Sequence, residues 1–186
     1  SWLGYYEPYT SKPISSYIYE MMMENGQEDI AVETNLLPFD VKVLEPTRTI
    51  CEKIMSLVRF SHGEAPLDRL KRKIRHTYDL HQLLQNDDLR KFFDSADFDK
   101  MLIKVGNEDV VSFKNNNAWL EHHPGKAVLF ADLDRIWPEL KLTYTGDFSN
   151  LVYGKLPLEN EIAKTLKLVK ERLSSVEWTV KIENPK

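Results

Sequence analysis

The sequence predicts a predominantly helical α+β fold, in which one or a few N-terminal strands precede a C-terminal helical bundle. Apolar residues recur every three or four positions through most of the chain, which is the spacing of amphipathic helices. Only 7 of the 186 residues are glycine, which agrees with a helix-rich chain. One short stretch instead alternates apolar and polar residues, as a half-buried strand does. The length is sufficient for a sizeable core.

In the N-terminal part, a short helix is expected from Ser15 or Ser16 to Met23, because serine is a favoured N-cap and Asn-Gly follows. The stretch Trp2–Thr10 is aromatic and turn-like, without a clear period. The alternating stretch Phe39–Leu44 is expected to be a strand. Its side chains expected to face a core are Phe39, Val41 and Val43.

The next helix is expected to begin at Thr49, because Thr49 and Glu52 have the spacing of a capping box. Its buried stripe consists of Ile50, Ile54, Leu57 and Val58. A second helix, Arg69–Leu84, should follow after a short loop and lie beside the first. Further helices are expected over residues 87–93, 96–105 and 128–144, with a break at Trp137–Pro138, and from Pro157 to Trp178.

Composition narrows the class of protein. The net charge of −4 does not favour electrostatically driven binding of nucleic acid. No apolar run approaches the roughly 20 residues that span a bilayer, so no membrane association is expected. A single cysteine, Cys51, excludes an internal disulfide framework and agrees with a reducing, cytoplasmic location. Cys51 lies in a first helical turn without a catalytic signature, so we interpret it as a buried structural thiol.

Lys53 and Asp79 are the candidate functional residues. A lysine beside an apolar helix face can bind phosphate as a point charge, and a nearby carboxylate can orient it. The structural alternative is that Glu52 and Lys53 cap and solvate a helix while Arg75 and Asp79 form an ion pair one turn apart. The pattern alone favours this alternative and does not decide between the two.

A metal centre is not predicted. His122 and His123 are adjacent in a loop, without the spacing of a zinc site. Two Asp-x-Asp triplets occur, at residues 97–99 and 132–134. Both lie in expected helices, where carboxylates two positions apart point in different directions, so we interpret them as helix caps and surface charge.

From Pro38 to Leu57 the sequence resembles the AbiEii/AbiGii family of nucleotidyltransferase toxins. A strand ends in a Pro-Thr-Arg-Thr turn, and a helix with Glu52-Lys53 follows. A second helix then carries Arg75-His-Thr-Tyr-Asp79-Leu, which is similar to the Arg-Asp-x-x-Asp-Leu pattern of the family. The resemblance extends into the helical tail, through residues 151–157.

The resemblance implies a role for each of these residues. Lys53 matches the lysine that contacts phosphate or acts in catalysis, and Asp79 the late acidic residue that positions the lysine, the nucleotide or the accepting group. Arg75 and Glu52 would support substrate binding. His76 stands where many relatives have aspartate, which puts the role of that position in doubt. The implied activity is transfer of NMP from an NTP to an RNA or protein acceptor.

The Gly-Ser turn and the Asp-x-Asp strand that bind triphosphate and Mg²⁺ in the family should precede the strand ending at Leu44, and they are absent. The chain therefore resembles the C-terminal portion of the enzyme. Residues 1–84 would be the last part of a nucleotidyltransferase-like domain, and residues 85–186 a helical domain. Mg²⁺ and NTP are cofactors expected of the intact parent, and neither is expected to bind tightly to this portion, which should be inactive alone.

Two alternatives stay open. The chain could be a non-catalytic helical module that contacts a partner such as an antitoxin; Lys53→Ala and Asp79→Ala would then leave the biological effect unchanged. It could also derive from an enzyme that adenylylates a sugar or another small molecule. A cognate antitoxin and an RNA acceptor are the partners that the resemblance implies, and the sequence does not predict an oligomeric state.

Overall fold

The computed structural model describes residues 7–182, and the chain divides into two compact units after Glu45. The first unit is a small hairpin with two short helices, and the second is a helical unit. Part of the expected aromatic stretch Trp2–Thr10 lies outside the described residues. The two units are described separately below.

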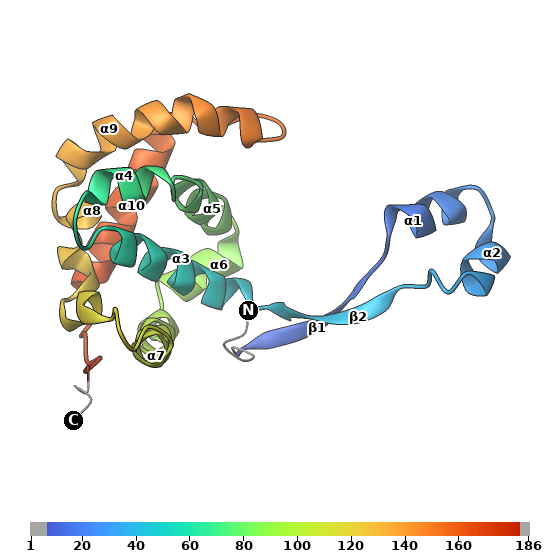
Figure 1. The fold of residues 1–186 in the computed structure, drawn as a ribbon, viewed down its shortest axis with the longest axis horizontal. Coiled ribbons are helices and arrows are strands. Elements are labelled where there is room, and N and C mark those ends of the chain that lie inside the picture. The colour runs from blue at the N-terminus through green and yellow to red at the C-terminus, as the bar shows by residue number, and fades with distance from the viewer. Residues whose placement is uncertain (1–6, 183–186) are drawn as a thin grey trace. The chain divides into compact units, whose positions relative to one another are not determined.

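The first unit, called the hairpin unit from here on, is built on two antiparallel strands. Strand β1 (Tyr9–Ile14) pairs with β2 (Phe39–Leu44), in a register that joins Tyr9 to Leu44 and Ile14 to Phe39. Between them the chain forms α1 (Tyr17–Glu24) and α2 (Glu28–Glu33) (Figure 1). The strand expected at Phe39–Leu44 and the helix capped by Ser16 are confirmed. Residues 9 and 10, expected to be turn-like, are instead strand.

The hairpin unit has almost no core. Of its described residues, only Ala31 is a buried apolar residue. Phe39 is 61% exposed and Val43 is exposed as well, so the prediction that both face a core is wrong for this unit. The alternation was a correct sign of a strand, but a two-stranded sheet has no second layer to cover its apolar face.

The second unit, called the helical unit, consists of helices joined by short turns (Figure 1). Its α-helices are α3 (Pro46–Phe60), α4 (Pro66–Lys71), α5 (Arg75–Leu84), α6 (Asp87–Phe93), α7 (Ala96–Ser112), α8 (Val128–Ala131), α9 (Leu133–Thr145) and α10 (Glu159–Ser174). Short 3₁₀ turns occur at Ala118–Glu121, Pro124–Lys126 and Asp147–Leu151. The predominantly helical α+β fold is confirmed.

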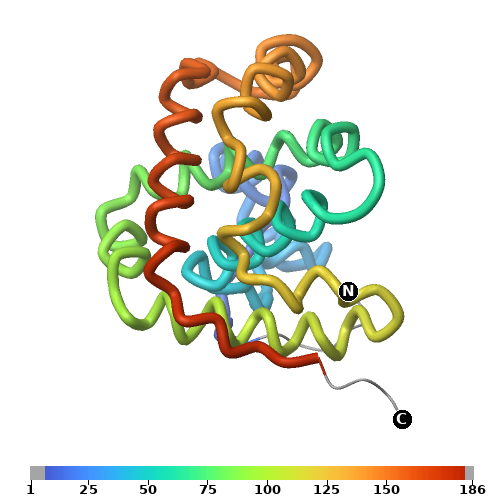
Figure 2. Tube along the Cα trace, turned by 90° about the vertical axis from the view of Figure 1, so that its left-hand side faces the viewer, coloured from blue at the N-terminus to red at the C-terminus, as the bar shows by residue number. Residues whose placement is uncertain are grey.

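Helix α3 lies at the centre of the helical unit, where it packs against α5 and α7. Helix α10 packs on α5, α8 and α9 and closes the other side, and Figure 2 shows it as the long red helix. One continuous core joins these helices. It includes the predicted stripe of α3, Ile50, Ile54, Leu57 and Val58, together with Phe98, Leu102, Ile162 and Leu166.

Several predicted boundaries are wrong. Helix α3 begins at Pro46 and not at Thr49, because proline suits the first helical turn, where its missing N–H is not needed. The helix expected over Arg69–Leu84 is two helices, α4 and α5, separated by residues 72–74. The break expected at Pro138 occurs at Asp132, whose backbone is non-helical, while Pro138 lies inside α9.

The predicted domain boundary between residues 84 and 85 stays a prediction about the nucleotidyltransferase-like domain. Leu84 itself is buried in the common core, so residues 46–84 pack as one body with the later helices. Among residues 7–182, no helix combines the length and apolar character that crossing a membrane requires.

Candidate functional site

Lys53 and Asp79 meet where α3 packs against α5. Lys53 directly precedes the buried Ile54, so its side chain leaves α3 at the edge of the apolar stripe. Asp79 occupies the corresponding place beside the buried Leu80 on α5. The Lys53 Nζ lies 2.6 Å from Asp79 Oδ2, although the residues are 26 positions apart. The prediction that the two helices lie side by side is confirmed, and their packing brings these two charges together.

The pair is only partly shielded from solvent. The side chain of Lys53 is 24% exposed and that of Asp79 is 17% exposed, so both side chains keep some contact with solvent. Burial by itself would raise the pKa of Asp79, but the neighbouring His76, Lys53 and Arg75 outweigh it and lower this pKa to about 2. Asp79 is therefore a fixed negative charge at neutral pH.

Arg75 and His76 complete this cluster. Arg75 Nε lies 3.5 Å from Asp79 Oδ1, and the Arg75 side chain is largely exposed. His76 Nδ1 is 3.9 Å from Asp79 Oδ2, which is too far for a hydrogen bond, and this buried nitrogen has no other partner among the described residues. The two ends of the Asp79 carboxylate thus face different cations, with Lys53 bound most closely.

Glu52, predicted to support substrate binding, belongs to another cluster. Its Oε1 accepts a hydrogen bond of 2.8 Å from Arg48 Nε, one turn earlier on α3. Arg48 Nη2 also donates to Glu108 Oε2 on α7. Arg48 is 1% exposed, so this guanidinium is buried and held between two carboxylates. The substrate-binding role of Glu52 stays a prediction.

The Arg48–Glu108 contact was not predicted from the sequence. The spacing of Arg48 and Glu52, four positions apart, was a usable sign of an ion pair. Glu108 lies 60 positions away from Arg48, and no local pattern joins them. Only the packing of α3 against α7 brings these two side chains into contact.

Two further titratable groups lie at the α3–α7 contact. Burial raises the pKa of Asp109 to about 7, and the attraction of Arg59 offsets only part of this shift. Burial also raises the pKa of the Cys51 thiol far above its ordinary value. Cys51 is fully buried, as predicted, and its thiol stays protonated and unreactive at neutral pH.

Residues 7–182 do not provide a metal centre, because no group of three or more histidine, cysteine or carboxylate side chains comes together in them. In the two Asp-x-Asp triplets each carboxylate has its own cation. Asp97 pairs with Lys100, Asp99 with Arg172, Asp132 with Arg135 and Asp134 with Lys167. The described residues therefore do not fit a catalytic Mg²⁺.

Comparison with protein families supplies the decisive observation. The family model for the nucleotidyl transferase AbiEii toxin of type IV toxin–antitoxin systems matches residues 3–176, which is nearly the whole chain. The chain belongs to the AbiEii family. Comparisons with curated proteins and with solved structures give no match.

The α3–α5 cluster has the chemistry of a phosphate contact. It presents the ammonium of a partly exposed lysine held in place by a carboxylate, with the guanidinium of the exposed Arg75 nearby. Such an arrangement can bind an anionic oxygen as a point charge, and a fixed carboxylate limits the freedom that lysine loses on binding. Asp79 is bound to Lys53 and is therefore engaged as the partner of the ammonium.

Proposed function

We propose that the protein transfers NMP from an NTP to an acceptor, with Lys53 contacting the triphosphate and Asp79 positioning Lys53. The observation that carries this proposal is the 2.6 Å contact between Lys53 Nζ and Asp79 Oδ2, with the Lys53 side chain 24% exposed. Family membership supplies the class of reaction, a nucleotidyltransferase of a toxin–antitoxin system.

In this proposal the positive charge of Lys53 stabilises the transition state of nucleotidyl transfer. Negative charge develops on the phosphoryl oxygens during transfer, and a positioned ammonium stabilises it without moving. Arg75 is free to turn toward a second phosphate, because its side chain is 77% exposed and its contact with Asp79 is long. The negative Asp79 holds Lys53 at the surface of α3 before the nucleotide arrives.

We further propose that the 186-residue chain alone does not transfer nucleotides. It contains no Gly-Ser pair, and its Asp-x-Asp carboxylates are engaged with cations. The carboxylates that would hold Mg²⁺ for the intact protein would lie outside residues 7–182. The reaction would take place in the cytoplasm, on an RNA or protein acceptor, with an antitoxin as the counteracting partner.

Growth inhibition by the intact natural gene product tests the role of the pair. Lys53→Ala and Asp79→Asn should each abolish inhibition while the fold, followed by circular dichroism, is retained. Lys100→Ala is the matched control, because Lys100 is an exposed lysine on α7 and pairs with a neighbouring aspartate. Unchanged toxicity of both site variants would remove the catalytic proposal.

The proposed inactivity of the 186-residue chain can be tested directly. The chain is incubated with labelled NTP, Mg²⁺ and total cellular RNA or protein. No labelled acceptor should form. Incorporation of label by the chain alone, lost in Lys53→Ala, would show that it carries a complete site and would contradict the proposed inactivity.

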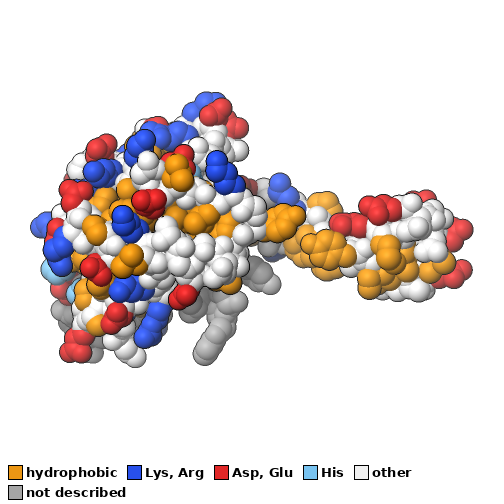
Figure 3. Space-filling model, turned by 90° about the horizontal axis from the view of Figure 1, so that it is seen from above, with side chains coloured by type: hydrophobic (Ala, Val, Ile, Leu, Met, Phe, Trp, Pro, Cys, Tyr) orange, Lys and Arg blue, Asp and Glu red, His pale blue; other side chains and the backbone are white. Residues whose placement is uncertain are grey.

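A second candidate function is a protein-interaction module, and the surface of the hairpin unit favours it. Large apolar side chains are exposed on both helices and strands of this unit, as the orange side chains in Figure 3 show. They include Tyr17, Ile18, Met21, Val32, Leu37 and Phe39. Double substitution of Tyr17 and Ile18 by serine should abolish toxicity under this alternative, whereas the Lys53 variant should not.

A further inference from the structure

A hollow of about 450 Å³ lies in the helical unit, at the C-terminal end of α3. Its walls come from the end of α3, from the loop after α7 and from the chain that leads into α8. Val58, Trp119 and Val128 form its apolar side. Because Trp119 is itself buried and its Nε1 donates to the Asn116 carbonyl, it forms a fixed wall.

The polar side of the hollow carries one lysine and two exposed histidines, and no carboxylate is among its lining residues. His62, His122 and Lys126 line it, and all three side chains are exposed to solvent. None of the three forms a salt bridge with a carboxylate of the described residues, so Lys126 is available to an anion. The lining therefore favours an anionic group at the mouth of the hollow.

Ser61 supplies a second, independent sign of a ligand. Its side chain is 7% exposed and lines the hollow, and its Oγ has no hydrogen-bond partner among the described residues. Buried hydroxyl groups are nearly always hydrogen-bonded, because an unpaired one has lost water without compensation. A ligand oxygen at the base of the hollow would accept this hydrogen bond.

His123 fixes the loop that carries His122 and Lys126. Its Nδ1 accepts a hydrogen bond of 3.0 Å from the Gly125 N–H, and its Nε2 lies 2.9 Å from the Val176 carbonyl. The two contacts together define one neutral tautomer, with the proton on Nε2. His123 is thus a positioning residue that ties His122 and Lys126 to the chain after α10, and it is not available to a ligand.

We propose that this hollow binds a nucleoside monophosphate unit, with the phosphate toward Lys126, His122 and Ser61 and the apolar part against Val58 and Val128. The presence of a phosphate site follows from the lining alone, and the choice of a nucleotide rests on the proposed function. Ser61 directly follows the last residue of α3 and comes eight positions after Lys53, which corresponds to about 12 Å at the rise of an α-helix. The hollow is therefore separate from the Lys53–Asp79 cluster and suits a nucleotide of the acceptor.

Binding of AMP to the 186-residue chain tests this proposal, with isothermal titration calorimetry as the measurement. Lys126→Glu and the double change His122→Ala with Lys126→Ala should each weaken AMP binding at least tenfold, because charge-assisted contacts to the phosphate are lost. These residues are exposed, so the variants should fold normally, which thermal unfolding verifies. Inorganic phosphate should bind more weakly than AMP, since it does not reach the apolar wall.

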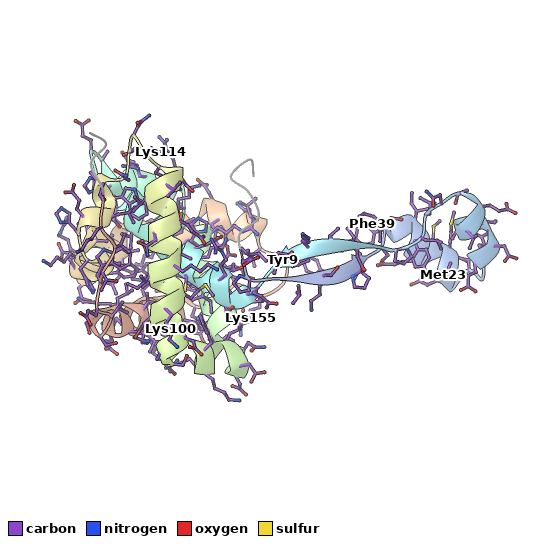
Figure 4. The ribbon with its side chains drawn as sticks, turned by 90° about the horizontal axis from the view of Figure 1, so that it is seen from below. Tyr9, Met23, Phe39, Lys100, Lys114 and Lys155 are labelled. Carbon is purple, nitrogen blue, oxygen red and sulfur yellow. The ribbon has the colours of Figure 1, made fainter. Side chains whose placement is uncertain are left out.

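Lys100→Ala is the matched control, because it removes a lysine from α7 outside the hollow; Figure 4 shows Lys100 on that helix. It should leave AMP affinity unchanged. A short oligoribonucleotide distinguishes the two sources of the nucleotide. Tighter, Lys126-dependent binding of the oligoribonucleotide assigns the hollow to a polynucleotide end, and tighter binding of AMP assigns it to a free nucleotide.

Equal AMP affinity of the wild-type chain and Lys126→Glu would overturn the proposal, as would absence of AMP binding. Loss of AMP binding in Lys53→Ala but not in Lys126→Glu would place the nucleotide at the α3–α5 cluster instead. That result would remove the hollow as a binding site while leaving the proposed function intact.

Discussion

The hairpin unit and the helical unit place their apolar residues in opposite ways. In the helical unit the apolar side chains of α3, α5, α7 and α10 form one buried core. In the hairpin unit most large apolar side chains are exposed, although its strands and helices are as regular in backbone. Regular secondary structure therefore does not by itself mean that a segment stabilises itself.

The physical reason is the number of layers. Burial of apolar area supplies most of the favourable free energy of folding, and it needs a second surface opposite the first. Helix α3 has such surfaces on two sides, α5 and α7. The β1–β2 pair has none within its own unit, and isolated two-stranded sheets are marginal in water. The helical unit is thus stabilised by its own core, whereas the hairpin unit leaves most of its large apolar side chains exposed.

Charge also differs between the units. Residues 17–37, which contain α1 and α2, carry five acidic residues and no lysine, arginine or histidine. In the helical unit, acidic and basic side chains form partly buried clusters such as Arg48 with Glu52 and Glu108. Substitutions in the two units should therefore differ in their effect on stability, and the ionised groups of the helical unit should make its stability depend on pH.

The largest difference should come from paired phenylalanine substitutions. Phe98→Ala in α7 should lower the free energy of unfolding of the helical unit by about 3–5 kcal/mol, because Phe98 is fully buried between Phe92 and Phe93. Phe39→Ala in β2 should cost less than about 0.5 kcal/mol. Urea unfolding followed by circular dichroism measures both values. Similar losses of unfolding free energy in the two variants would contradict the conclusion that only the helical unit has a buried core.

Arg48→Met tests the buried ion cluster. It removes the cation between Glu52 and Glu108, and we expect a loss of about 2 kcal/mol, since both carboxylates keep about a third of their exposure and are partly hydrated. The control is Lys42→Met in β2, whose ammonium lies 4.5 Å from the Tyr9 ring centroid and should contribute less than about 0.5 kcal/mol. A more stable Arg48→Met variant would mean that desolvation outweighs pairing.

Acid titration tests the Lys53–Asp79 pair. The folded pKa of Asp79 is about 2, below its unfolded value, so the unfolded state binds more protons as pH falls. The pair should contribute about 2 kcal/mol above pH 4 and lose this contribution between pH 4 and pH 2. Chemical unfolding at a series of pH values measures it. In Asp79→Asn the pH dependence in this window should be smaller, and an unchanged profile would contradict the assigned pKa.

Asp109 should make the stability depend on pH with the opposite sign. Its folded pKa is raised to about 7, so between pH 4 and pH 7 the folded state holds a proton that the unfolded state has lost, and stability falls as pH rises. Asp109→Asn should therefore be more stable than the wild type by about 1 kcal/mol at pH 8 and should gain nothing at pH 4. Denaturant midpoints at the two pH values decide it, and a loss of stability at pH 8 would refute the raised pKa.

Local sequence patterns predicted many of the helices and the strand at residues 39–44 correctly, but they did not predict where the helices begin and end. The alternation in Phe39–Leu44 identified a strand, and the spacing of Ile50, Ile54 and Leu57 identified the buried side of α3. Helix starts were less predictable, because Thr49 and Pro46 both carry favourable signals and only one can begin the helix. Pro138 shows the same limit, since α9 tolerates it where the pattern predicted a break.

The sequence by itself determined the helical class, the strand in residues 39–44 and the family, together with Lys53 and Asp79 as the residues to test. These depend on residue type and spacing, which the chain carries locally. Only the tertiary structure decided that Lys53 meets Asp79, that Glu52 turns to Arg48 instead, and that Phe39 has no core to enter. Contacts between distant segments depend on which faces pack together, and the sequence of one segment does not specify which other segment it packs against.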